Sequence, residues 1–431
     1  MTEHPIILAV EDDLARNRLT VFFRLILAIP HLIWVTVWTI GAFFVAVVNW
    51  FATLITGRPP QALHNFLSAY VRYSVHLSAY LHLVADPYPG FAGRPGSYPV
   101  DATLPTEPQP QERWKTLLRL ILALPAILLS AVLGGVGGPS FNFSRTAGGG
   151  RASGYGGGGG GALGAFCAVL GWFAVLATGR MPRGLRDAAA YGIGYGAQVG
   201  AYLFLITDRY PNADPTPLLE TVPRPEEHPV RLIGDAHDLR RSRVTVFFRL
   251  PLTIPHIVWL ALWTIAAVLV GIVNWFATLI TGTPPAAFHR FFTAYVRYSL
   301  HVNAFLYLAA NPFPGFTGAP GRYPLDLELP EQPQPQNRWK TAFRIVLVIP
   351  AFIVNAALGW ALILAAVYTW FVALATGAAP WGLRNLSAYC LRYAAQLNAY
   401  VYLVTDRYPH ASPLEGHEEP YELGEPVPLP A

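Results

Sequence analysis

Histidines are the side chains of this chain best suited to chemistry, because an imidazole can bind a metal ion or move a proton near neutral pH. His64 and His76 lie twelve residues apart in a segment with helical periodicity. That separation is about three turns, too long for both rings to ligate one ion. A metal site would need histidines from separate segments, and at two corresponding places the chain has Gln198 and Gln396 instead of His76. We therefore predict no metal site and interpret the histidines as polar residues at a membrane interface.

Other patterns for catalysis or cofactor binding are missing from the sequence. There is no HExxH motif, no Ser/His/Asp order and no pair of carboxylates within an apolar segment. The glycine-rich segment 134–161 lacks the features of a phosphate-binding loop, so we interpret it as a flexible linker. Cys167 and Cys390 provide neither a disulfide framework nor metal-ligand spacing. We expect the protein not to be an enzyme and to bind no cofactor.

The composition indicates a membrane protein. Hydrophobic residues make up 53% of the 431 residues and charged residues only 13%, whereas a soluble domain carries about 25% charged residues. The net charge is +5, which we attribute to basic residues flanking membrane segments rather than to a nucleic-acid-binding surface, because no soluble module is evident. The expected partner is the lipid bilayer, including anionic lipids, with no nucleic acid.

The sequence is a tandem duplication in which each half contains two related repeats. RLTVFFRLILAIPHLIWVTVWTI, which begins at Arg18, recurs as RVTVFFRLPLTIPHIVWLALWTI from Arg243, an offset of 225 residues. An arginine six residues before a proline, and a sequence similar to WFATLITG, occur in all four repeats. The predicted domains are repeat 1 at 1–91, repeat 2 at 97–211 with a glycine-rich insertion at about 134–161, repeat 3 at 229–316, repeat 4 at 322–410, and a polar tail at 411–431.

Each long apolar stretch is predicted to form a membrane hairpin. Residues 19–57 are too long for one span of about 20 residues. The insertion of repeat 2 falls within the matching stretch and has to emerge near an interface, at a point equivalent to Gly41. We therefore predict a helix at 19–40, kinked by Pro30, and a second at 42–57. The alternative is one long tilted span at 30–56 preceded by an interfacial elbow at 18–29.

The hairpin determines the expected topology and the number of spans. Basic residues flank the apolar stretch on both sides, and a hairpin places both flanks in the cytoplasm, as the positive-inside rule requires. We predict eight spans, with four to twelve remaining open, in a multi-pass protein of the bacterial plasma membrane whose N-terminus is cytoplasmic.

An amphipathic aromatic helix follows each apolar stretch, at about 61–85 in repeat 1. Its polar stripe either lies in the interface plane, which we favour, or packs inward in a bundle. Candidate contacts of this stripe with lipid headgroups or other polar groups are Arg72, His76, Arg297, His301, Arg392 and Gln396. Asn49 and Asn274, each beside a tryptophan in a membrane helix, are candidates for polar contacts between helices.

The expected fold is an all-α integral membrane protein of four repeats. Each repeat contains a membrane helical hairpin and an amphipathic aromatic helix. Each also opens with a short alternating run: IILAV, YPVDATL, VRLIG and YPLDLEL. These runs are typical of short strands, and we expect them to form a small sheet outside the membrane.

These features together resemble a known bacterial membrane family. Arg24 precedes an Ile-Pro-His sequence at 29–31, WFATLITG and VRYSVHLSAY follow, and Asp-Pro-Tyr-Pro at 86–89 closes the repeat. The combination is similar to the domain of unknown function 4389, which is common in actinobacteria. Repeats 2 and 4 depart from the pattern with Ala126 and Ala351 in place of His31, and repeat 2 has Gly194 in place of Arg72. The resemblance implies topology and location but supplies no catalytic or ligand-binding residues.

The function predicted from the sequence is that of a non-enzymatic membrane scaffold or lipid-interacting assembly factor. Two alternatives stay open. Internal duplication is typical of transporters, so one alternative is a transporter or channel with a pathway between the halves. The other is a membrane enzyme acting on lipids, for which no residue set is evident.

Overall fold

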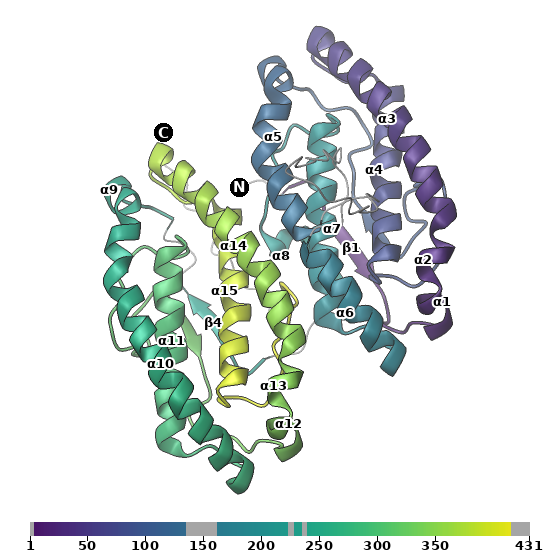
Figure 1. Ribbon diagram of the computed structural model, residues 1–431. Helices are drawn as coiled ribbons and strands as arrows, with labels where there is room; N and C mark the ends of the chain where they lie inside the picture. The colour runs from purple at the N-terminus through teal and green to yellow at the C-terminus, as the bar shows by residue number, and fades with distance from the viewer. Residues whose placement is uncertain (1–3, 135–161, 223–227, 235–238, 415–431) are drawn as a thin grey trace, which may run out of the picture. The chain divides into compact units, whose positions relative to one another are not determined.

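The computed structural model describes residues 4–134, 162–222, 228–234 and 239–414. The chain divides into two compact halves (Figure 1). The N-terminal half comprises residues 2–212 and 216–224, and the C-terminal half comprises residues 213–215 and 225–431. Each half holds two of the repeats.

The two halves contain matching series of helices and strands. Those of repeats 1 and 2 are β1 (Leu8–Glu11), α1 (Arg18–Phe22), α2 (Arg24–Leu27), α3 (Ile29–Thr56), α4 (Gln61–Leu81), β2 (Val100–Ala102), α5 (Arg113–Leu133), α6 (Ala162–Thr178) and α7 (Arg183–Leu203). The link between the halves carries α8 (Pro215–Leu218) and β3 (Leu219–Val222). Repeats 3 and 4 contain β4 (Arg231–Gly234), α9 (Arg243–Phe247), α10 (Arg249–Thr281), α11 (Ala286–Leu306), β5 (Leu325–Glu328), α12 (Arg338–Ala342), α13 (Arg344–Leu347), α14 (Ile349–Thr376) and α15 (Trp381–Val401).

The N-terminal half is built in three layers. A Cβ added at Gly192 of α7 would collide with the Leu133 carbonyl of α5, whereas one at Gly194 would lie 3.2 Å from the Leu8 side chain of β1. Residues two apart in a helix point in nearly opposite directions. The middle layer of α4 and α7 therefore separates an outer layer of long apolar helices from a strand layer (Figure 1).

The turn predicted near Gly41 is wrong. α3 runs without interruption from Ile29 to Thr56, and α10 and α14 are equally continuous. Among the described residues, four helical segments are long and apolar enough to cross a membrane, rather than the eight expected. They are α3, α5, α10 and the segment Arg344–Thr376, which comprises α13 and α14. Repeat 2 alone has two separate apolar helices, α5 and α6, and the insertion between them lies outside the described residues. The insertion in repeat 2 therefore did not indicate a turn in the other repeats. The alternative prediction of one long helix in repeat 1 is confirmed.

Proline starts a helix in repeats 1 and 4 instead of kinking one. Pro30 and Pro350 are each the second residue of a long helix, where the fixed φ of proline fits and its missing N–H leaves no bond broken. The preceding residues form the short helices of an elbow, α1 and α2 in repeat 1. The far end of α3 is the predicted one, because Gly57 takes a left-handed conformation with φ of 76°.

The amphipathic aromatic helices are buried, not interfacial. Nearly every residue of α4 from Leu67 to Tyr80 is buried, as is almost all of α7. The polar stripe of α4 faces β2 and its aromatic face contacts α3. Because the polar stripe of α4 packs inward, its polar groups form hydrogen bonds with protein atoms and do not need water at a membrane interface.

A leucine in the left-handed conformation ends each middle-layer helix. After α4, Leu83 has φ of 61°, and the N–H of Val84 donates to the Ala79 carbonyl. This is the hydrogen bond of a Schellman motif, in which glycine usually occupies the left-handed position. Leu205, Leu308 and Leu403 take the same conformation in the other repeats. Their side chains are buried, so packing holds a backbone conformation that leucine rarely adopts.

The four predicted strands are present, in two sheets rather than one. β1 pairs with β2 in the antiparallel sense and with β3 in the parallel sense, so that Leu8 lies opposite both Ala102 and Leu219. β4 pairs with β5 in the C-terminal half. β3 was not predicted, because it lies in a proline-rich link.

The two repeats of a half exchange matching contacts. Trp50 at the end of α3 donates to the Thr116 carbonyl in α5, and Trp172 of α6 donates to the Val21 carbonyl in α1. Each long helix thus packs its C-terminal end on the elbow of the other repeat. The C-terminal half repeats this exchange, since Trp275 donates to the Thr341 carbonyl and Trp370 to the Val246 carbonyl.

Candidate functional site

A buried arginine in each elbow binds the end of the middle-layer helix of its own repeat. In repeat 1, Arg24 donates to the Tyr80 carbonyl at 2.7 Å and the Ala85 carbonyl at 3.1 Å, and pairs with Asp86 at 2.6 Å. Its guanidinium also lies over the Tyr80 ring, 4.4 Å from the centroid. A helix C-terminus carries partial negative charge, so the buried cation is well placed there.

The other repeats keep this arginine, and repeats 2 and 4 also keep its aspartate partner. Arg119 pairs with Asp208, and Arg344 pairs with Asp406 at 2.8 Å. Arg249 donates to the carbonyls of Ala310 and Asn311, and Asn311 stands where the other repeats have aspartate. The sequence showed these arginines only as landmarks before a proline, and nothing in their spacing indicated which groups they bind.

A second cluster joins the polar stripe of α4 to the strand layer. Asp101 of β2 lies 3.2 Å from Nε of Arg72 and 3.3 Å from Nε2 of His76, and its other oxygen accepts from the Gly96 N–H at 2.7 Å. Burial alone raises the pKa of the Asp101 carboxyl, but the hydrogen bonds from His76 and Gly96 and the charge of Arg72 outweigh it and hold this pKa below its ordinary value. The Asp101 carboxylate therefore joins β2 to the middle of α4 through these contacts.

Repeat 3 contains the same cluster, and repeat 4 does not. Asp326 of β5 lies 3.1 Å from both Arg297 and His301. In repeat 4, Arg392 donates to the Ser412 carbonyl and Gln396 to the Val230 carbonyl. The structure thus brings Arg72 and His76 together, and likewise Arg297 and His301. All six candidate residues of the polar stripe contact protein groups, and the strand carboxylates among those groups were missed because they lie 25 or more residues away in sequence.

Replacing Asp101 with asparagine is expected to lower the free energy of unfolding by about 1–2 kcal/mol at pH 7, because a half-buried, hydrogen-bonded charge is lost. The folded pKa lies below the ordinary value of 3.8, so this stabilisation is present above that pH and is lost as the pH falls below it. Unfolding in detergent at pH 7 and pH 3 checks this, and the difference between the two proteins should be smaller at pH 3. Asp13→Asn, at an exposed carboxylate, is the control. Equal stability of Asp101→Asn and wild type at pH 7 would contradict the prediction.

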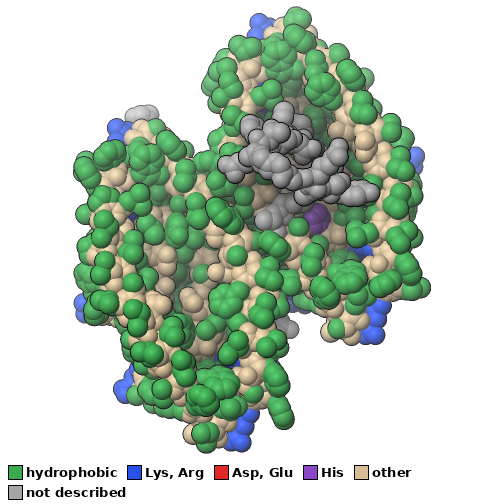
Figure 2. Space-filling view, viewed as in Figure 1, with side chains coloured by type: hydrophobic (Ala, Val, Ile, Leu, Met, Phe, Trp, Pro, Cys, Tyr) green, Lys and Arg blue, Asp and Glu red, His purple; other side chains and the backbone are tan. Residues whose placement is uncertain are grey.

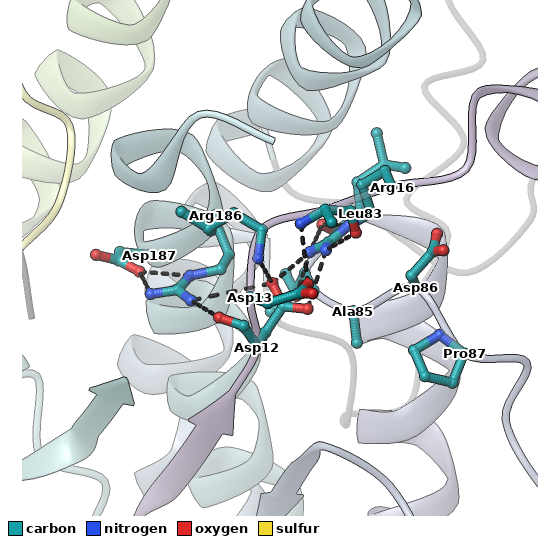
Figure 3. A network of polar contacts seen from close by, with 12 residues as sticks. Asp12, Asp13, Arg16, Leu83, Ala85, Asp86, Pro87, Arg186 and Asp187 are labelled. Carbon is teal, nitrogen blue, oxygen red and sulfur yellow. Dashed lines mark hydrogen bonds and ion pairs between the residues drawn. The ribbon is translucent and has the colours of Figure 1, made fainter. Parts of the chain in front are cut away.

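A third cluster ties the two repeats of the N-terminal half together (Figure 3). Arg186 and Asp187, at the start of α7, form a fully buried ion pair at 2.7 Å. Arg186 also donates to the Asp12 carbonyl. Asp12 in turn pairs with Arg16, whose guanidinium donates to the Leu83 carbonyl just after α4. The segment between β1 and α1 is thereby joined to both middle-layer helices.

The membrane-helix asparagines contact the ends of middle-layer helices. Asn49 of α3 donates to the Phe204 carbonyl at 3.1 Å, and Asn274 of α10 to the Tyr402 carbonyl at 3.2 Å. Each accepting carbonyl belongs to the other repeat of the same half. Among the described residues, no group of three or more His, Cys, Asp or Glu side chains is arranged to hold a metal ion.

A comparison with protein families explains the fourfold recurrence of these contacts. A family model described as a domain of unknown function (DUF4389) matches residues 18–92, 160–213, 243–317 and 338–412. The chain belongs to this family. The DUF4389 matches include the elbow arginine in repeats 1, 3 and 4, whereas in repeat 2 the match begins at residue 160. No curated protein and no solved structure matches the chain.

Proposed function

We propose that the protein is a non-enzymatic scaffold of the bacterial plasma membrane that binds anionic lipids, with its N-terminus in the cytoplasm. The observation that carries this proposal is the exposed face of the outer layer. In α3, for example, the side chains of Ile33, Phe44 and Ile55 are 63%, 63% and 75% exposed. Figure 2 shows hydrophobic side chains covering this face. Soluble proteins rarely expose apolar patches larger than a few hundred Å², so lipid is the environment that this face fits.

Basic residues at the ends of the long helices support a preference for anionic lipids. In the N-terminal half, Arg18 and Arg180 are exposed at one end of the outer layer, and Arg58 and Arg113 at the other. A lysine or arginine near an anionic membrane surface contributes about 1 kcal/mol to binding. The buried charges, in contrast, are engaged in internal contacts. A scaffolding role without catalysis is the simplest function for such an arrangement.

The protein is expected to resist extraction from membranes by high salt and by alkaline carbonate, and to leave only with detergent. Salt screens charges but leaves apolar contact with lipid intact. Mass spectrometry of the purified protein should find phosphatidylglycerol enriched over phosphatidylethanolamine, and Arg58→Gln with Arg180→Gln should reduce that enrichment. Arg94→Gln, at an exposed arginine between α4 and β2, is the matched control. Release by carbonate would contradict membrane integration, and equal lipid ratios would contradict the lipid preference.

A transporter is the second candidate, favoured by the tandem duplication. Duplicated halves are common in transporters, where the substrate pathway lies between them. Flux of ions or small solutes through proteoliposomes, measured against empty liposomes, tests this candidate. Flux that depends on the protein would support the transporter and contradict the scaffold proposal.

A further inference from the structure

We infer that each half lies flat in one leaflet, with its long helices parallel to the membrane plane. The outer layer faces the acyl chains, both ends of α3, α10 and α14 lie among the headgroups, and the strand layer faces the cytoplasm. This inference rests on the membrane association proposed above. It identifies the partner of the apolar face as one anionic leaflet. In this arrangement the long helices lie along that leaflet and do not cross the bilayer.

The first argument is the charge at the two ends of the long helices. At the elbow end of α3, Arg18 donates to the Ala177 carbonyl, which places it beside the C-terminus of α6. At the other end, Arg113 donates to the Ile55 carbonyl, and Arg58 is exposed nearby. Both ends are therefore basic. The positive-inside rule places such residues in the cytoplasm, and a helix crossing the bilayer would carry one of its two ends to the other side.

The second argument is the polarity of the face opposite the outer layer. Val10 and Leu219 point inward from β1 and β3 and are buried, whereas Glu11 and Glu220 are exposed. Thr103, just after β2, is exposed as well. The outward surface of the strand layer is thus polar and carries carboxylates. One half therefore has an apolar face and a polar face on opposite sides, as a protein bound in one leaflet requires.

The third argument is the position of the strands along the long helix. His31 and Thr39 of α3 contact Tyr73 and Tyr70 of α4. The next turn of α4 carries His76, which binds Asp101 of β2. The strands therefore lie across α4 from the N-terminal part of α3, next to the middle of the apolar stretch that begins at the elbow.

This position excludes a simple crossing arrangement for one half by itself. Asp101 lies opposite Ala9 of β1, which lies opposite Glu220 of β3. A crossing α3 would hold the exposed carboxylate of Glu220 at the depth of the hydrocarbon. Exposed polar backbone and charges are not tolerated there unless they line a water-filled space. In the flat arrangement the same groups are in water.

The C-terminal half shows the same features independently. His256 and Thr264 of α10 contact Tyr298 and Tyr295 of α11, and His301 of α11 binds Asp326 of β5. The strands β4 and β5 carry an ion pair between the partly exposed side chains of Arg231 and Glu328. Its long helices also end at basic residues, since Arg243 donates to the Ala375 carbonyl and Arg338 to the Ile280 carbonyl.

Labelling of single cysteines from each side of the membrane tests the inference. The variants are Arg58→Cys and Arg180→Cys at the two helix ends and Glu220→Cys in the strand layer, each in the full chain with Cys167→Ala and Cys390→Ala. Right-side-out and inverted vesicles are treated with a membrane-impermeant maleimide, and detergent-solubilised protein gives complete labelling. We expect all three cysteines to react from the cytoplasmic side only. Reaction of Arg58→Cys and Arg180→Cys from opposite sides, or protection of Glu220→Cys on both sides, would overturn the inference.

Spin-label depth gives a second measurement that does not depend on sidedness. Ile29, Ile40 and Phe51 follow each other at intervals of eleven residues on the exposed face of α3, and Ile254, Ile265 and Phe276 match them on α10. The outer two of each set are about 33 Å apart along the helix, close to the hydrocarbon thickness of about 30 Å. Equal depth of the three labels is expected for a flat helix, and a maximum at the central label would overturn the inference. Release of the protein by carbonate would instead refute the membrane proposal on which the inference rests.

Discussion

Replacing Arg24 with alanine is expected to lower the free energy of unfolding of the N-terminal half by about 2–4 kcal/mol, because a buried cation that is hydrogen-bonded to two carbonyls and paired with a partly exposed carboxylate is lost. The guanidinium joins the elbow to the C-terminal end of α4 through two carbonyls and Asp86. Its removal takes one donor from each of those carbonyls and leaves the carboxylate without its cation. Unfolding in detergent, followed by tryptophan fluorescence, measures the loss.

Three further variants separate the parts of this contact. Arg18→Ala removes an exposed arginine that binds one carbonyl, and little change is expected. Arg249→Ala should destabilise its half by less than Arg24→Ala, because its partner is Asn311 and no carboxylate is left unpaired. Adding Asp86→Asn to Arg24→Ala should recover part of the loss for the same reason. If Arg24→Ala were no more destabilising than Arg18→Ala, the assigned role of the elbow arginine would be incorrect.

Replacing Gly93 with alanine is expected to lower the free energy of unfolding by about 2–5 kcal/mol, from backbone strain and overpacking together. Gly93 has φ of 56°, and an added Cβ would collide with the Ala69 carbonyl and lie 2.8 Å from the Tyr73 amide nitrogen. Both groups are backbone atoms of α4, so neither can move without distorting the helix. The loop that Gly93 brings against α4 also holds Phe91, whose ring stacks on His31 at 4.1 Å.

The chain supplies a matched control three residues away. Gly96 also has a positive φ, 67°, but an added Cβ there would meet no atom within 4 Å. Gly96→Ala should therefore lower the free energy of unfolding by only about 1–2 kcal/mol, the cost of a positive φ for alanine. Gly318 and Gly321 repeat the contrast in the C-terminal half. Thermal unfolding of the four alanine variants checks the prediction, and equal midpoints for Gly93→Ala and Gly96→Ala would contradict it.

Features encoded by nearby residues could be predicted from the sequence. The repeats follow from identical segments, the four strands from alternation, and the end of α3 from Gly57. The length of α3 could not be predicted in this way, because its composition fits two short helices as well as one long helix. The insertion in repeat 2 suggested a turn, yet a helix can be interrupted in one copy and continuous in the others.

Features that depend on distant residues could not be predicted. Leu83 ends α4 in a conformation that favours glycine, and it is held there by packing against Val21, Val175 and Met181 and by the hydrogen bond from Arg16 to its carbonyl. The polar stripe of α4 could equally well face lipid headgroups or protein until Asp101 was placed beside it. The sequence shows which side chains can form ion pairs, and the fold determines which of them meet.

The exchange of tryptophan contacts between the repeats of one half bears on how the protein arose. Trp50 of repeat 1 donates a hydrogen bond to repeat 2, and Trp172 of repeat 2 donates one to repeat 1. The strands β1 and β2 pair in the antiparallel sense. Such reciprocity is that of a twofold homodimer interface. One half is therefore arranged like a dimer whose two subunits belong to a single chain, and the linker keeps them at high effective concentration. A relative with a single repeat would have to obtain the missing contacts by self-association. Once joined, the two copies are free to differ, as Gln198 and Gln396 differ from His76 and His301.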